Sequence, residues 1–369
     1  MKLLPALALP LLLTGCGMAD YYWQSLNGQM EILNGAKPLD EVIAQSDDAR
    51  LKDRLERARS IRAYASRELG LPDNASYLRY TELGRPFVVW NVFATPELSL
   101  KPREWCFPVV GCVNYRGYFI EQEARDEAAR FRAAGDDVYI GGVPAYSTLG
   151  WFDDPILSSF VRYPDTEFAR LVFHELAHQV VYVKGDTVFN ESFAAAVEDA
   201  GVRRWIATQP AGATRERLEA ELVRSERLRG EFRQLVRETR ARLTAIYASK
   251  APDSVKREDK IAAFAAMRDA YERAKAGDPS LSGFDRWFAG AANAGPNNAS
   301  LAAIALYSDR VPAFRAMLKE EGGNFPRFYE RVKVLAAMPK VERDAVLTAI
   351  AASQPVAADR ATALGAVRE

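Results

Sequence analysis

The stretch Phe173-His174-Glu175-Leu176-Ala177-His178 contains both histidines of this 369-residue chain. They stand four residues apart, and on a helix this spacing places one side chain above the other on the same face. Two imidazoles in this arrangement can bind one Zn²⁺ ion, and Glu175 can reach a water on that ion. The stretch therefore predicts a metal-binding helix with one zinc ion per chain.

The residues around this motif favour a largely buried helix. Asp165 can cap its N-terminus, and apolar residues recur after it at helical spacing. Gly185 follows the apolar run and can end the helix.

A catalytic zinc site usually has three protein ligands and one open position. Because the chain has no third histidine, the third ligand must be a carboxylate or a cysteine. Glu191 lies on the next predicted helix, which runs to about Thr208, and would face back at the histidines after a turn near 184–186. Glu198, seven residues later, shares that face and can orient a ligand histidine.

HExxH followed by Asn190-Glu191 and then Phe193-Ala194 resembles the gluzincin metallopeptidases, in which a downstream glutamate is the third zinc ligand. The gap to Glu191 is shorter than in thermolysin or the large zinc aminopeptidases, so the connection between the helices must differ. The chain is more similar to a family of bacterial lipoproteins known as predicted aminopeptidases. Besides the zinc segment, that resemblance rests on CFPVVGC at 106–112, AYSTLGWFDDP at 145–155 and NNA at 297–299.

The resemblance implies a zinc peptidase in which His174, His178 and Glu191 hold the ion and Glu175 is the general base. A donor is then expected to stabilise the oxyanion. Tyr307 and Tyr146 are the candidates, and a packed structural tyrosine is the alternative for Tyr307. Arg310 and the asparagines at 297–298 are weaker candidates for holding the substrate backbone.

Trimming of N-termini follows from the family resemblance alone. An aminopeptidase must bind a free α-amine, and the available carboxylates are Asp153, Asp154, Glu198 and Asp199. Asp153-Asp154-Pro155 is more typical of a helix cap than of a metal or substrate-amine site. Two alternatives stay open: a zinc endopeptidase of the cell envelope, and a non-catalytic envelope lipoprotein with a structural zinc site.

Residues 1–15 are typical of a bacterial lipoprotein signal peptide, with Lys2 before a short apolar run. Leu13-Thr14-Gly15-Cys16 fits a lipobox, so we expect Cys16 to carry lipid; an ordinary signal peptide is the alternative. Gly17 gives no inner-membrane retention signal, which favours a periplasmic protein anchored to the outer membrane. Residues 16–36 are expected to be a lipidated tether or edge segment, with Tyr21, Tyr22 and Trp23 docked on the domain or on lipid headgroups.

The expected fold is α+β: a mainly helical, zincin-like metallopeptidase domain over 37–353, with a small sheet beside the zinc helix. Helices are predicted at 40–46 and 49–69, and strands at 77–80 and 87–93. Residues 213–277 predict a long helical hairpin that acts as a lid, a brace or an arm for an envelope protein partner. Residues 354–369 are expected to be a disordered tail.

Cys106 and Cys112 are the cysteines left after lipidation, and in an oxidising periplasm such a pair most often forms a disulfide. A second metal site is the alternative, but it lacks further ligands. Residues 145–148 are a candidate edge strand for pairing with a substrate backbone, with a plain loop as the other interpretation.

The charge balance argues against nucleic acid as a partner. Lysine and arginine total 49, aspartate and glutamate total 49, and the formal net charge is +0. Binding to a polyanion would need a basic surface. A peptide substrate and a membrane, reached through the N-terminal lipid, are the expected partners.

Overall fold

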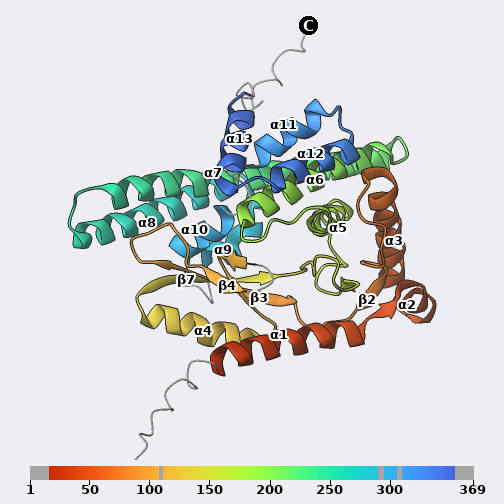
Figure 1. Cartoon of the computed structure of the whole chain (residues 1–369), viewed down its shortest axis with the longest axis horizontal. Helices are drawn as coiled ribbons and strands as arrows, with labels where there is room; N and C mark the ends of the chain where they lie inside the picture. The colour runs from red at the N-terminus through yellow and green to blue at the C-terminus, as the bar shows by residue number, and fades with distance from the viewer. Residues whose placement is uncertain (1–15, 108–110, 290–294, 306–309, 354–369) are drawn as a thin grey trace, which may run out of the picture.

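The computed structural model describes residues 16–107, 111–289, 295–305 and 310–353. Over these residues the chain is a mainly helical α+β protein with 13 α-helices and small sheets (Figure 1). Tyr307, the signal segment and the C-terminal tail lie outside the described residues.

Two packed helices, α5 (Asp165–Val180) and α6 (Thr187–Ala207), carry the zinc motif and Glu191. Helix α5 ends at Val180, earlier than the predicted end at Gly185, because Val181 is already extended. Gly185 instead provides a left-handed residue, φ +76°, in the turn to α6. The side chain of Asp186 then caps α6 by accepting a hydrogen bond from the Phe189 amide.

Asp165 does not cap α5, which corrects another prediction. Pro164 occupies the N-cap position, with no side-chain cap. The Asp165 carboxylate instead binds Arg54 and Arg57 of α3 (Ala49–Leu69), so it ties the zinc helix to a neighbouring helix.

The main hydrophobic core surrounds α5 and α6. Helix α3 has the bounds that were predicted, and α2 (Leu39–Gln45) precedes it. On the other side lie three helices: α11 (Val311–Glu320), which the sequence analysis missed, α12 (Phe325–Ala336) and α13 (Lys340–Ala352). Phenylalanine rings from several of these elements fill the interface: Phe168, Phe173, Phe189, Phe193, Phe314 and Phe328.

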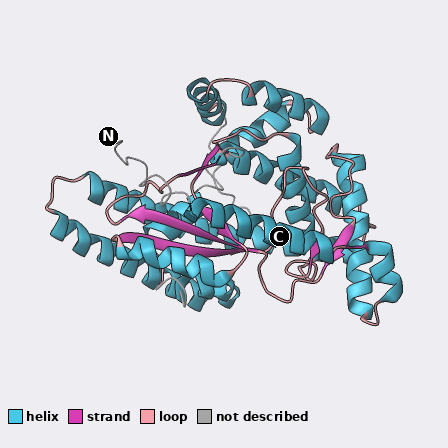
Figure 2. Ribbon diagram, turned by 60° about the horizontal axis from the view of Figure 1, so that its bottom comes forward, coloured by secondary structure: helices cyan, strands magenta, loops and turns pink. Residues whose placement is uncertain are grey.

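The largest strand pairing is in a three-stranded antiparallel sheet. Its central strand, β3 (Val89–Pro96), pairs with β6 (Arg116–Tyr118) and β7 (Asp136–Val143). One face packs on α4 (Glu121–Ala133) through Trp90, Val92 and Ala94. On the other face, Phe93 packs against α10 (Asn298–Ala305). Figure 2 shows the long strands lying side by side with helices against them.

The remaining strands are short. One sheet has the order β1 (Lys37–Pro38), β2 (Arg79–Thr81) and β8 (Ile156–Leu157). The hairpin of β4 (Trp105–Phe107) and β5 (Gly111–Val113) contains the predicted Cys106–Cys112 disulfide. Because the two cysteines are bonded to each other, the alternative of a second metal site there is wrong. Residues 145–148 form a loop, because β7 ends at Val143 before Pro144, so the edge-strand prediction there was wrong.

The predicted helical hairpin is present. Helices α7 (Ala213–Ala248) and α8 (Asp253–Gly277) pair and project to one side of the molecule in Figure 1. A separate apolar cluster joins them to η1 (Pro279–Phe284) and α9 (Asp285–Ala289). Phe232 of α7 stacks on Phe284 at 4.4 Å between ring centroids.

The expected tether is a helix, α1 (Cys16–Gly35), that lies along one edge of the protein (Figure 1). Tyr21 docks on the domain, where its ring stacks on Phe107 and lies under the Arg116 guanidinium. Trp23 instead has 65 % of its surface exposed. Among the described helices, none has the length and apolar character needed to cross a bilayer.

Candidate metal centre

Three side chains from α5 and α6 point at one another. His174 Nε2 lies 3.2 Å from His178 Nε2 and 3.2 Å from Glu191 Oε2. Glu191 Oε1 is 3.8 Å from His178 Nε2. The helical i, i+4 spacing aligns the two imidazoles, and the turn at 181–186 brings α6 back so that Glu191 completes the group.

The distances suit a zinc ion. With Zn–N bonds of about 2.0–2.1 Å, two tetrahedral ligands lie about 3.3 Å apart. The donor chemistry fits as well, because two imidazole nitrogens and a carboxylate all present lone pairs to one point. Two Nε2 atoms 3.2 Å apart cannot both bear a proton, whereas a cation between them satisfies both.

Glu198 contacts Nδ1 of His174, the ring nitrogen that points away from the place where the three donor atoms meet. Its Oε2 is 2.8 Å from His174 Nδ1, so the carboxylate accepts the Nδ1 proton and leaves Nε2 free as a donor to a metal. In contrast, His178 Nδ1 is buried without a partner in the described part of the chain. The orientation of His174 is therefore fixed by a carboxylate, while that of His178 depends on packing.

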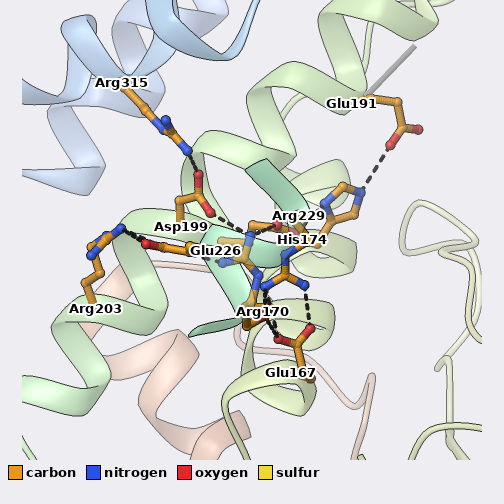
Figure 3. A network of polar contacts seen from close by, with 11 residues as sticks. Glu167, Arg170, His174, Glu191, Asp199, Arg203, Glu226, Arg229 and Arg315 are labelled. Atoms are coloured by element: carbon orange, nitrogen blue, oxygen red, sulfur yellow. Dashed lines mark hydrogen bonds and ion pairs between the residues drawn. The ribbon is translucent and has the colours of Figure 1, made fainter. Parts of the chain in front are cut away.

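An ion-pair network continues from this point, and Figure 3 shows how His174 lies between Glu191 and the arginine-rich side of the network. Arg170 donates to Glu198 Oε1 at 2.7 Å and to Asp199 Oδ1 at 2.6 Å. Asp199 also pairs with Arg315 of α11. Arg170 is buried, so its positive charge offsets the two carboxylates inside the protein.

Burial and neighbouring charges shift the pKa values of Glu175 and Glu198 in opposite directions. Burial raises the pKa of Glu175 to about 7; His174 opposes this rise, and Glu191 and Asp154 add to it. Burial would also raise the pKa of Glu198, but Arg170 and His174 outweigh it and lower the pKa to about 2. Glu175 can therefore exchange a proton near neutral pH, while Glu198 remains a carboxylate.

The pKa values of the two histidines also shift in opposite directions. Burial lowers the pKa of His178 to about 4, which leaves a neutral ring with a free lone pair. Burial also disfavours a charged His174, but hydrogen bonds to Glu191 and Glu198 raise its pKa well above the usual value. A proton and a metal ion would compete for Nε2 of His174.

A cavity of about 480 Å³ opens in front of these groups. Its lining includes His174, His178, Glu175 and Glu191, and these two glutamates are the only acidic side chains that the described residues contribute. The walls are aromatic and come from α1, the β4–β5 hairpin, the β3–β6–β7 sheet and the end of α5: Tyr21, Tyr22, Phe107, Tyr115, Phe119, Tyr146 and Tyr182.

The other predicted site residues have varied positions. Tyr146 lines the cavity, but its hydroxyl binds Gln29 of α1. Asp154 is buried and does not cap a helix; its carboxylate accepts a hydrogen bond from the Thr148 amide. Asp153 is exposed and does not line the cavity.

The weaker candidates for holding the substrate backbone bind other parts of the protein. The Arg310 guanidinium binds Thr348 of α13. Asn297 donates to the Val138 carbonyl and Asn298 to the Glu97 carbonyl, so both fix α10 in place.

The sequence analysis missed several residues that surround the site. Tyr115 and Tyr182 line the cavity; burial raises the pKa of both, and the charge of Glu191 adds to this. Arg170 and Asn91 were also missed. Arg170 could have been found from helical periodicity, because it lies four residues before His174 on the same helix. No sequence spacing connects Asn91 of β3 to the motif.

The fold and the site together define a mainly helical α+β protein with a buried His-His-Glu candidate metal centre in a cavity. Over residues 20–347 the chain matches the family described as "Putative aminopeptidase", and it belongs to that family. No curated protein and no solved structure matches the chain. The zincin-like part of the fold prediction therefore stays a prediction.

Proposed function

We propose that this protein is a zinc-dependent peptidase, and that it removes N-terminal residues, as the description of its family suggests. The observation that supports this most is the convergence of His174, His178 and Glu191 on one point beside Glu175. A structural zinc site has no need of the Glu175 carboxylate or of an adjoining cavity.

When bound, zinc supplies Lewis acidity and lowers the pKa of a coordinated water toward neutrality. Glu175 lies beside the ligands and lines the same cavity. It accepts the proton of the attacking water and passes it to the leaving amine. Glu198 holds the His174 ring in place through Nδ1. Aromatic side chains form the walls of the cavity beside these groups.

Glu175→Gln tests this role. We expect it to retain zinc, because Glu175 is not one of the three donors, and to lose about 10²- to 10⁴-fold in peptide hydrolysis. Zinc content and initial rates are measured on the same preparations. A variant with full zinc and full activity would remove Glu175 from the mechanism.

An endopeptidase is the second candidate, and one observation favours it. Asp154 is bound to a backbone amide, and Glu198 and Asp199 are paired with Arg170. The described part of the cavity therefore holds no spare carboxylate for an α-amine. Comparing one peptide with a free and an acetylated N-terminus separates the candidates, because an aminopeptidase cleaves only the free form.

A further inference from the structure

Asn91 occupies an unusual place in the β3–β6–β7 sheet. It pairs with Gly117 on β6 and with Gly141 on β7. Directly opposed residues in an antiparallel sheet share a face, so Asn91 is flanked by a glycine on each side. Glycine inside a strand often marks a place where a ligand approaches closely.

The space beside Asn91 depends on Gly117. A Cβ atom at Gly117 would lie 3.0 Å from Asn91 Oδ1 and 3.0 Å from Val89 Cγ1. Any side chain there would crowd the carboxamide. Val89, Asn91 and Gly117 all line the cavity that contains the candidate metal centre.

The Asn91 carboxamide has an unused hydrogen-bonding group. Its side chain is buried, with 7 % of the residue exposed, and Oδ1 has almost no accessible surface and no partner within the described part of the chain. Leaving a buried polar atom unpaired costs on the order of 1–3 kcal/mol, so each such atom needs an explanation. Because Oδ1 is closed off, the hydrogen bond open to a ligand is donation from Nδ2 to a peptide C=O.

The surroundings of Asn91 are apolar. The neighbouring wall is formed by Val143, Tyr115, Phe119 and Tyr146. This wall would bury an apolar side chain favourably but would leave a charged one without a partner.

We propose that the Asn91 carboxamide binds a main-chain amide of the substrate and that the wall around it takes a bulky, uncharged side chain next to the scissile bond. This inference rests on the proposed peptidase function for the nature of the ligand. It makes Asn91 a substrate-binding residue and defines the substrates as peptides with large apolar residues.

The test uses the zinc-loaded Glu175→Gln protein, which binds peptide without cleaving it, and the probe Phe-Leu-Ala-amide. Calorimetry measures Kd, and a thermal melt measures Tm. We expect Asn91→Leu and Asn91→Ala to weaken binding about 3- to 10-fold, the equivalent of one neutral hydrogen bond. Replacing phenylalanine in the probe by glutamate should weaken binding more than about tenfold.

The melting temperature distinguishes recognition from structure. Because Asn91 Oδ1 has no partner, its replacement by leucine should leave Tm unchanged or higher. Thr95→Val is the matched control: Thr95 lies on the same strand, and its buried hydroxyl also lacks a partner in the described structure, but it does not line the cavity. That control should leave Kd unchanged.

Gly117→Ala adds an independent variant, because its methyl group would crowd Oδ1 without removing it. It should weaken probe binding as Asn91→Ala does. The proposal is overturned if the reference protein does not bind the probe, if a folded Asn91 variant binds it as tightly as the reference, or if neither Asn91 variant folds. Asn91-dependent binding without hydrolysis by the wild type would support this site while refuting the peptidase function.

Discussion

Glu198 illustrates how one residue can act on a candidate metal centre without being one of its donors. It receives Nδ1 of His174 on one oxygen and Arg170 on the other, so its position is set from both sides. Arg170 in turn holds Asp199, which pairs with Arg315. The metal-facing orientation of His174 therefore depends on residues of α5, α6 and α11.

We expect Glu198→Gln to weaken zinc binding by about 10- to 100-fold while the fold is kept, because the amide is a weaker acceptor for Nδ1–H and does not balance Arg170. Competition with a metal chelator measures the affinity. Glu226→Gln is the control, since Glu226 lies 3.9 Å from Arg170 at the far side of the network. Equal affinities for Glu198→Gln and the wild type would show that this contact does not hold the ligand.

Asp154 gives a pH-dependent prediction. Burial raises its pKa from 3.8 to about 6, and hydrogen bonds from Thr148 only partly oppose this. The stability linked to the neutral acid is fully present below 3.8 and is lost as the pH rises through about 6. Asp154→Asn keeps an acceptor for the Thr148 amide but carries no charge.

We therefore expect the free energy of unfolding of Asp154→Asn to match that of the wild type near about pH 4 and to exceed it by up to about 3 kcal/mol near about pH 7.5. Denaturant unfolding at the two pH values measures this. A constant difference between the proteins at both pH values would contradict the burial argument.

At the scale of elements, α6 meets α3 and α5 at Gly201. A Cβ atom there would lie 2.8 Å from Leu69 Cδ1 and 2.9 Å from Phe173 Cδ2, both on fully buried side chains. This close approach brings α6 against the zinc helix and so helps to place Glu191 opposite the histidines.

Gly201→Ala should destabilise the protein by about 1–3 kcal/mol, because the added methyl group overpacks the contact. Gly230→Ala in α7 is the matched control, since no atom lies within 4 Å of its added Cβ. There the higher helix propensity of alanine should stabilise by up to about 1 kcal/mol. Thermal or denaturant unfolding measures both changes in stability. A loss for Gly201→Ala with a gain for Gly230→Ala confirms the contact, and changes of the same sign contradict it.

The elements that the sequence predicted well are long helices, such as α3, α6, α7 and α8. Secondary-structure predictions failed where tertiary contacts, and not the local sequence pattern, determine the conformation. Residues 16–35 were expected to be a tether or edge segment, and the helix α1 that they form was not predicted. Residues 145–148 have no strand partner, because Pro144 follows the last paired residue of β7.

At the scale of the whole molecule, the cavity forms only where α1, the disulfide hairpin, the β3–β6–β7 sheet and the α5–α6 pair meet. The hairpin contacts the turn after α5, since a Cβ atom at Gly111 would lie 2.8 Å from the Gly185 amide nitrogen. One wall of the cavity is therefore supplied by the helix that begins at Cys16.

We propose lipidation of Cys16 and an envelope location, which the sequence alone suggests. Cys16→Ser should move the protein from the membrane fraction to the soluble fraction, because a lipid chain adds about 0.8 kcal/mol of membrane binding per buried CH₂ group. Fractionation and the mass of the mature N-terminus measure this. A wild-type protein with no added lipid mass would refute the anchor.

The sequence by itself determined the candidate metal donors, because two histidines at i, i+4 on one helix and a glutamate near the start of the next need only helical geometry to converge. It also determined the disulfide and the long hairpin, which depend on short-range pairing. Only the tertiary structure decided which other side chains line the cavity beside these donors. Asn91, Tyr115 and the walls of the cavity come from strands and loops whose packing partners lie far along the chain, and no local pattern encodes those distances.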